Sequence, residues 1–145
     1  MASKERWNHT PAAHDFEAAA DYLSLLFDEV TVRGVVRRLR TATMTTKKAK
    51  DLLRASRLDL LPADDFELLK DLKKVKKGER LSPVLLVRGG LEGNRPLIVA
   101  DGYHRICASY HLDEDADIPC RLADLPPPRV QTVTSPAKRS TRGRP

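Results

Sequence analysis

The fold of this chain is decided by the stretch Pro96-Leu97-Ile98-Val99-Ala100-Asp101-Gly102-Tyr103-His104-Arg105. Its first half is a continuous apolar run, which is typical of a buried strand. The glycine permits a sharp turn, and the residues after it begin a helix whose free amides attract anions. The sequence therefore predicts a phosphate-binding turn between a strand and a helix.

The polar residues of this turn suit phosphate chemistry. The Arg105 guanidinium can grip two phosphate oxygens, and His104 can donate a hydrogen bond or move a proton near neutral pH. Asp101 can bind a metal, orient His104 or accept a proton from a substrate, while Gly102 and Tyr103 supply backbone amides. Each residue also has an ordinary structural interpretation, as a helix cap, turn glycine, packing residue or solvated charge.

The flanking sequence predicts the rest of the fold. Apolar runs indicate strands at 83–87 and 96–100, joined by a glycine-rich turn, and alternation indicates another strand at 58–60. A last strand is expected at 117–122, on the sheet edge because it contains Pro119. Helical spacing is found at 15–27, 30–40, 66–75 and 103–111. The prediction is an α+β fold, a small mixed β-sheet with flanking helices, preceded by N-terminal helices.

Four segments are expected along the chain. Residues 1–14 are predicted to be a loose arm, and 15–46 an N-terminal helical segment. Residues 47–124 hold the strands and the turn. Residues 125–145 are expected to be a basic disordered tail, because they contain too few apolar side chains to fold.

The stretch from Leu81 to Leu122 resembles the ParB/sulfiredoxin-like superfamily. It reads L-S-P-V-L-L-V-R, then L-I-V-A-D-G-Y-H-R-I-C-A-S-Y, then I-P-C-R-L. The shared order is a strand, a strand ending in Gly-x-x-Arg, a helix and a return strand. Sulfiredoxins have G-C-H-R at this turn, and here Tyr103 replaces their redox cysteine. ParB-type partition proteins have G-E-R-R, which this chain matches at Gly102 and Arg105.

The motif is most similar to D-G-H-H-R of the free-serine kinases in this superfamily. Asp101, Gly102, His104 and Arg105 match it. In those kinases an acid after a proline accepts the proton of the substrate hydroxyl, and Pro62-Ala63-Asp64 occupies the equivalent place. The resemblance implies a nucleoside di- or triphosphate (ATP/ADP or CTP) with Mg²⁺ near Asp101. It also implies that Asp64, Asp101 and His104 are catalytic.

The net charge of +6 lies mainly in the tail. Residues 125–145 contain five basic residues and no acid, which leaves 21 basic against 20 acidic residues before them. Weak nucleic-acid contact is therefore expected through the tail. The arginines in 30–40 permit a helix-turn-helix interpretation, although a solvated helical face is favoured over it.

Composition excludes several classes of protein. No apolar run is long enough to span a membrane, and no secretory signal is recognised, so the cytoplasm is the expected compartment. Cys107 and Cys120 have neither disulfide-framework nor zinc-ribbon spacing.

Three functions stay open at this stage. The first is a nucleotide-binding protein that can transfer phosphate to a small hydroxyl compound. The second is a DNA-associated ParB-like module with a nucleotide switch, and the third is a noncatalytic regulatory binding protein.

Overall fold

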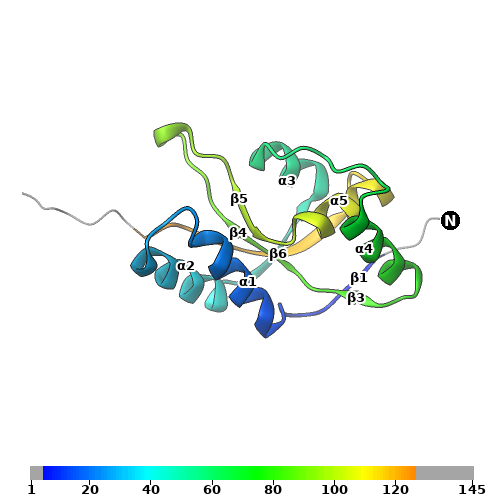
Figure 1. Cartoon of the computed structure of the whole chain (residues 1–145), viewed down its shortest axis with the longest axis horizontal. Coiled ribbons are helices and arrows are strands. Elements are labelled where there is room, and N and C mark those ends of the chain that lie inside the picture. The colour runs from blue at the N-terminus through cyan, green and yellow to red at the C-terminus, as the bar shows by residue number, and fades with distance from the viewer. Residues whose placement is uncertain (1–4, 127–145) are drawn as a thin grey trace, which may run out of the picture.

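A computed structural model of the protein describes residues 5–126. It is an α+β fold in which a four-stranded sheet lies between two layers of helices (Figure 1). In chain order the elements are β1 (Arg6–Trp7), α1 (Ala13–Leu23), α2 (Glu29–Thr41), β2 (Met44–Lys48), α3 (Ala49–Ser56), α4 (Phe66–Lys76), β3 (Arg80–Leu81), β4 (Val84–Val87), the short 3-10 helix η1 (Glu92–Asn94), β5 (Ile98–Asp101), α5 (Tyr103–Leu112) and β6 (Asp117–Ala123).

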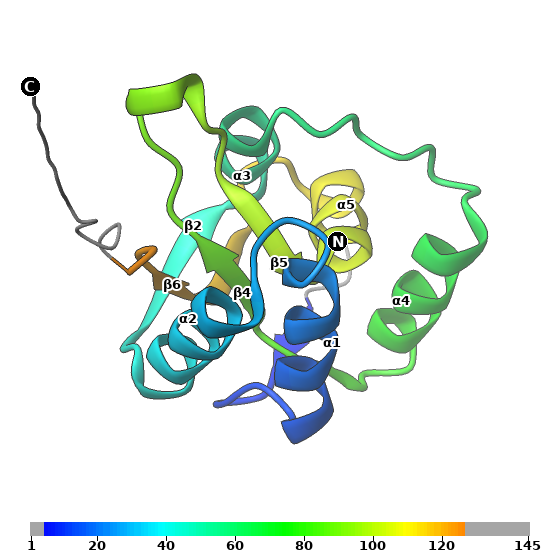
Figure 2. The same cartoon turned by 60° about the vertical axis from the view of Figure 1, so that its left-hand side comes forward.

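The main sheet has the strand order β2-β6-β4-β5 and is mixed. β4 pairs antiparallel with β5 and parallel with β6, and β6 pairs antiparallel with β2. β4 and β6 are therefore the central strands. The turn after β5 lies at one end of an edge strand, where helices from both layers reach it (Figure 2).

The two faces of the sheet are both covered, which explains the continuous apolar runs. Val84 and Leu86 of β4 pack into a core with α3, α4 and α5. Leu85 and Val87 point to the opposite face and pack against α1 and α2. The N-terminal helices thus form one layer of the same domain, because without them half of β4 would be exposed to water.

Two strand predictions are wrong. Residues 58–60 form no strand but lie in the connection between α3 and α4, and their leucines remain partly exposed. The edge position is taken by β2, whose sequence Met-Thr-Thr-Lys-Lys lacks an apolar run. β6 is central rather than at the edge. Pro119 pairs with Thr46 of the edge strand β2, and on the other side of β6 the ladder with β4 begins one residue later, at Cys120.

Part of the segment expected to be a loose arm is attached to the domain. β1 pairs parallel with β3, and the Asn8 amide donates a hydrogen bond to the Leu81 carbonyl oxygen. Of the tail expected at 125–145, residues 127–145 lie outside the described residues. Within 5–126, no helix combines the length and apolar composition that crossing a bilayer requires.

Candidate functional site

The turn between β5 and α5 is built on Gly102. Its backbone has a φ of 114° and a ψ of 15°, a conformation that side chains disfavour. A Cβ atom at this position would lie 2.4 Å from Cγ1 of Val84. Gly102 is also the N-cap of α5 and offers no side chain to cap it, so the first-turn amides of the helix receive no side-chain cap. These amides and the helix dipole give the turn a positive end.

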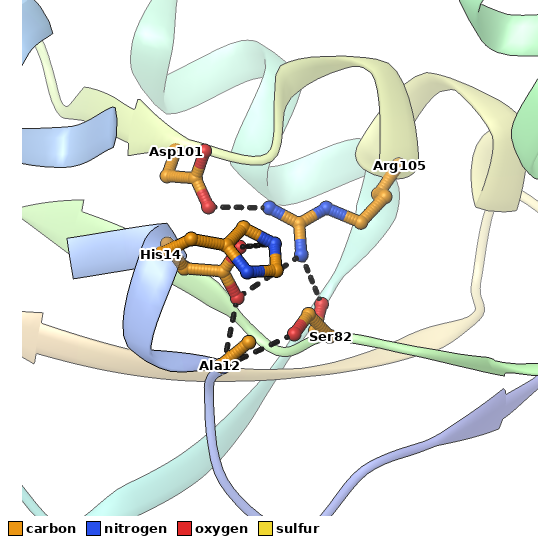
Figure 3. A network of polar contacts seen from close by, with 6 residues as sticks. Ala12, His14, Ser82, Asp101 and Arg105 are labelled. Atoms are coloured by element: carbon orange, nitrogen blue, oxygen red, sulfur yellow. Dashed lines mark hydrogen bonds and ion pairs between the residues drawn. The ribbon is translucent and has the colours of Figure 1, made fainter. Parts of the chain in front are cut away.

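Arg105 forms a partly buried ionic network behind this turn (Figure 3). Its Nη2 donates to Oδ2 of Asp101 at 2.6 Å, and its Nη1 donates to the Ser82 carbonyl oxygen at 2.6 Å. Oδ2 of Asp15 lies 3.9 Å from Nη1. The Arg105 side chain is only 13% exposed. Arg105 therefore cross-links β5, the segment before β4, and α1.

Asp15 is one of two members of this network, with Ser82, that sequence reasoning did not place. It stands in the first turn of α1, where its Oδ2 accepts a hydrogen bond from the Ala12 amide at 3.0 Å. The same amide lies 3.3 Å from the Ser82 hydroxyl oxygen. The sequence identifies Asp15 as an acid near a helix start, but no local pattern connects it to a turn more than eighty residues away.

With both carboxylates ionised, Asp15, Asp101 and Arg105 together carry a formal charge of −1. Two carboxylates surround one guanidinium, and they are 7% and 17% exposed. Burial raises the pKa of Asp101 above its ordinary value, Arg105 opposes the rise, and the Asp15 carboxylate adds to it. The positive charge of Arg105 is therefore largely neutralised by the Asp101 and Asp15 carboxylates. An anion at the turn needs a further cation.

A cavity of about 290 Å³ opens in front of the turn. All five residues of the predicted motif line it, Asp101, Gly102, Tyr103, His104 and Arg105. This contiguous motif therefore forms one wall of the cavity. The remaining lining residues are His14, Asp15, Glu67, Lys70, Asp71, Lys74, Leu81 and Ser82.

The second wall of the cavity comes from α4. Glu67, Lys70, Asp71 and Lys74 have i, i+3, i+4 and i+7 spacing, which places them on one helical face. Lys70 is paired with Glu67 at 3.3 Å, whereas Lys74 forms no ion pair with any residue in the range 5–126. Lys74 is the cation of this wall that remains available to a ligand.

The acids near His104 differ from the one expected. Nε2 of His104 lies 4.0 Å from Oδ2 of Asp65, which also caps α4 by accepting from the Leu68 amide. Asp64 is exposed and is not among the residues that line the cavity. Asp71 lines it and is half-buried. Burial raises its pKa, and Arg105 most of all, with Lys74 and His104, opposes that rise.

Tyr103 has a structural contact in addition to its place in the turn. Its hydroxyl donates a hydrogen bond to the Asp59 carbonyl oxygen. About two turns further along α5, Nε2 of His111 lies 2.7 Å from the Leu61 carbonyl oxygen. Both contacts hold the connection that leads into α4. They fix the second wall of the cavity relative to the first.

A metal ion at this site would need ligand atoms from a bound nucleotide as well as from the protein. Within residues 5–126, no three His, Cys, Asp or Glu side chains gather as a protein-only metal site. Mg²⁺ in nucleotide sites commonly uses one or two carboxylates together with phosphate oxygens and water. Asp101 fits the carboxylate part of that donor set, although Arg105 already engages its Oδ2.

Comparisons with known proteins add no assignment, since no family model, curated protein or solved structure matches the chain. The element order β4, β5, α5, β6 agrees with the order on which the ParB/sulfiredoxin-like resemblance rests. That resemblance itself stays a prediction.

Proposed function

We propose that the cavity binds the phosphate chain of a nucleoside di- or triphosphate. The observation that carries this proposal is the start of α5, whose first-turn amides have no side-chain cap and whose first residues line a cavity that Lys74 also lines. Phosphate binds at helix N-termini because unpaired amides and the helix dipole both favour negative charge. In this arrangement Lys74 supplies the cation that Arg105, held by two carboxylates, does not.

Mg²⁺ is part of the proposal. It would lie beside Asp101 and complete its coordination with phosphate oxygens, neutralising charge that Lys74 alone cannot. The nucleotide base is left open between ATP/ADP and CTP. The proposed compartment is the cytoplasm, with which the two buried, unpaired cysteines accord.

The proposed activity is phosphoryl transfer to a small hydroxyl compound. The hydroxyl oxygen attacks the terminal phosphorus, the bond from phosphorus to the bridging oxygen breaks, and the hydroxyl proton passes to a carboxylate. Asp71 is better placed than Asp64 to accept that proton, because it lines the cavity. Its raised pKa also brings it nearer to the value that suits a general base at neutral pH.

A noncatalytic binding protein is the second candidate. The observation that favours it is the Arg105 network, because an arginine held by Asp101, Asp15 and the Ser82 carbonyl contributes little charge to a transition state. Nucleotide binding without turnover is the outcome that would select it.

The first test is nucleotide binding by thermal shift. ATP, ADP, CTP and GTP are each added with and without Mg²⁺, and at least one is expected to raise the melting temperature, because a ligand of the native state stabilises it. Lys74→Gln should then lower the affinity for that nucleotide by about tenfold, because the loss of one charge-assisted hydrogen bond costs roughly 1.5 kcal/mol of binding free energy.

Lys76→Gln is the matched control. It removes the same charge from the same helix, but Lys76 does not line the cavity. Equal losses in both variants would show that the nucleotide responds to overall charge, and the cavity assignment would then be wrong. If none of the four nucleotides changed the melting temperature of the native protein, the proposal that the cavity binds a nucleotide would be wrong.

The second test separates the two acids. Asp71→Asn is expected to lower ADP release from ATP in the presence of hydroxyl compounds by 100-fold or more, since general bases contribute about 10²–10⁴-fold. Nucleotide affinity should change little, because the base acts in the transition state. Asp64→Asn is measured alongside it. Loss of turnover in Asp64→Asn alone would identify Asp64, not Asp71, as the general base. Absence of turnover in the native protein would favour the noncatalytic candidate.

A further inference from the structure

A second cavity lies at the end of β5 that is farther from the phosphate turn. Its volume is about 670 Å³, and it shares no lining residue with the first cavity. Three segments line it, the α1–α2 region, the β4–β5 hairpin and the residues that follow β6. The hairpin and the α1–α2 connection lie on the same side of the molecule (Figure 1). Cavities of this size commonly hold small molecules.

The hairpin wall of this second cavity is held in place by hydrogen bonds. The Gly90 amide donates to the Arg95 carbonyl oxygen and the Arg95 amide donates to the Gly90 carbonyl oxygen, both at 2.9 Å. Nη2 of Arg57, at the C-terminal end of α3, donates to the side-chain oxygen of Asn94 at 2.7 Å. The wall therefore has its shape without a ligand, which lowers the cost of binding one.

Arg95 is the feature of the second cavity that the fold does not explain. Its side chain lines the cavity and is partly buried, and its Nε atom is buried without a hydrogen-bond partner. No described residue forms an ion pair or a hydrogen bond with its guanidinium. Burial of an unpaired charge is unfavourable. Arg95 is therefore available to an anion that enters the cavity.

The cavity also has an apolar wall, formed by Phe27, Leu125 and Pro126. Phe27 and Leu125 pack against the core between the sheet and the N-terminal helices, but both are only partly buried. The part of their surface that lines the cavity is therefore open to a ligand. An apolar group bound there would be removed from water, which favours binding.

The charges of the lining favour a ligand with a single negative charge. Nε of Arg88 is paired with Oδ1 of Asp124 at 2.7 Å, so these two residues largely neutralise each other. Arg95 and the exposed Glu92 remain. One carboxylate matches the planar fork of an arginine. A polyanion would bring additional negative charge near Glu92 and Asp124, and like charges repel.

We infer that the second cavity binds a carboxylate attached to an apolar group. The carboxylate accepts hydrogen bonds from the Arg95 guanidinium, and the apolar group packs against the apolar wall. This chemistry occurs both in free monocarboxylic acids and at the C-terminus of a peptide whose last residue is apolar. The experiment has one arm for each source.

The full chain is titrated with 4-phenylbutyrate, and in the other arm with a tetrapeptide that ends in phenylalanine, while NMR follows the backbone amide signals. The signals of Gly89 and Gly93, which line the second cavity, should shift, and those of Gly102 and His104 should not. 4-Phenylbutyramide and the amidated peptide have the same apolar groups without the charge. They should bind at least about tenfold more weakly, because the charge-assisted hydrogen bonds are lost.

Three variants test the residues. Arg95→Gln should weaken the binding of 4-phenylbutyrate by about tenfold or more. Arg37→Gln is the matched control, because it removes the same charge from an exposed position outside the cavity, and it should change the affinity by less than about twofold. Glu92→Gln removes a negative charge from the lining and should raise the affinity by about twofold. Since Glu92 is exposed, this variant tests the inference even if Arg95→Gln does not fold.

Binding of the free acid alone would identify a small-molecule site, and binding of the peptide alone a site for a peptide C-terminus; both support the inference. It is overturned if neither probe binds, if each acid and its amide bind equally well, or if Arg95→Gln and Arg37→Gln have the same affinity. Shifts confined to residues of the first cavity would also overturn it, as would tighter binding of inorganic phosphate in the second cavity. Because the two cavities share no lining residue, this inference and the nucleotide proposal fail separately.

Discussion

Arg105→Met is expected to lower the free energy of unfolding by about 3 to 5 kcal/mol at neutral pH. The reason is not the loss of the Arg105 interactions alone but the state of the groups left behind. Asp15 and Asp101 are 7% and 17% exposed, and the variant would leave Asp101 without its cation and Asp15 with only the His14 ring, 3.5 Å from its Oδ1. Removal of one partner from a buried ion pair typically costs this much, because the remaining charge is uncompensated. Chemical denaturation at constant pH measures the loss.

The destabilisation should shrink as the pH falls. Arg105 opposes the burial that raises the pKa of Asp101, so its removal raises that pKa further. Between the unfolded value near 4 and the higher folded value, the folded variant then binds more protons than the unfolded chain. The free energy of unfolding therefore rises as the pH is lowered through this window. The difference between native protein and variant narrows there.

Arg88→Met is the matched control for this prediction. Arg88 forms an ion pair of similar length with Asp124, 2.7 Å from Nε to Oδ1, but these side chains are 62% and 64% exposed. An exposed pair contributes about 0 to 1 kcal/mol, so this variant should be nearly native at every pH. Equal losses in the two variants, or a loss in Arg105→Met that does not depend on pH, would contradict the structural role of Arg105.

The same experiment distinguishes two roles for Arg105. An arginine that only bound phosphate would leave stability unchanged when replaced, and only ligand affinity would fall. The contacts of Arg105 with Asp101, the Ser82 carbonyl and Asp15 predict a different result. Its replacement should lower the stability strongly, and ligand affinity should change only because the shape of the cavity changes. Arg105 would then be a positioning residue.

The sequence predicted the centre of the fold well because its signals there are local. β4 and β5 are buried on both faces, so their apolar runs are continuous and short, and the turn residues follow β5 directly. The edge strand β2 could not be recognised, because an exposed edge requires no apolar pattern. Leu58 and Leu60 alternate as strand residues do, yet periodicity alone does not determine which segment pairs with β6.

The site was predicted in part for the same reason. Asp101 to Arg105 are contiguous, so the motif carried them together into one wall of the cavity. Asp15, Ser82 and Asp71 reach the site only through packing of α1, the β3–β4 connection and α4. No spacing rule connects residues that far apart in the sequence. Their types, two acids and a serine, are also the commonest caps and surface groups.

Gly102→Ala is expected to be the second large effect, with a loss of about 3 to 5 kcal/mol in the free energy of unfolding. Two costs combine at this position. A φ of 114° is strained for any residue with a side chain, which costs roughly 1 to 3 kcal/mol. The new Cβ atom would also lie 2.4 Å from Cγ1 of Val84, and Val84 is fully buried in the central strand and cannot move aside freely.

Gly78→Ala separates these two costs. Gly78 has a φ of 78°, but nothing lies within 4 Å of the position its Cβ would take. This control should lose only about 1 kcal/mol, the cost of the backbone conformation. The difference between the two variants then measures the contact with Val84. If both variants lost the same small amount, the close approach of Gly102 to β4 would be wrong.

A double-mutant cycle with Val84→Ala tests the contact directly. Val84→Ala alone should be destabilising, because it leaves a cavity in the core. In the double variant the truncated side chain removes Cγ1, the nearest atom that the alanine at 102 would meet, and leaves Cβ of residue 84 at 2.8 Å. The double variant should therefore be more stable than the sum of the two single losses predicts, by 0.5 kcal/mol or more. Simple additivity would mean that the two residues are not in contact. A favourable coupling would show that β4 fixes the backbone of Gly102, and with it the direction in which the first amides of α5 face the cavity.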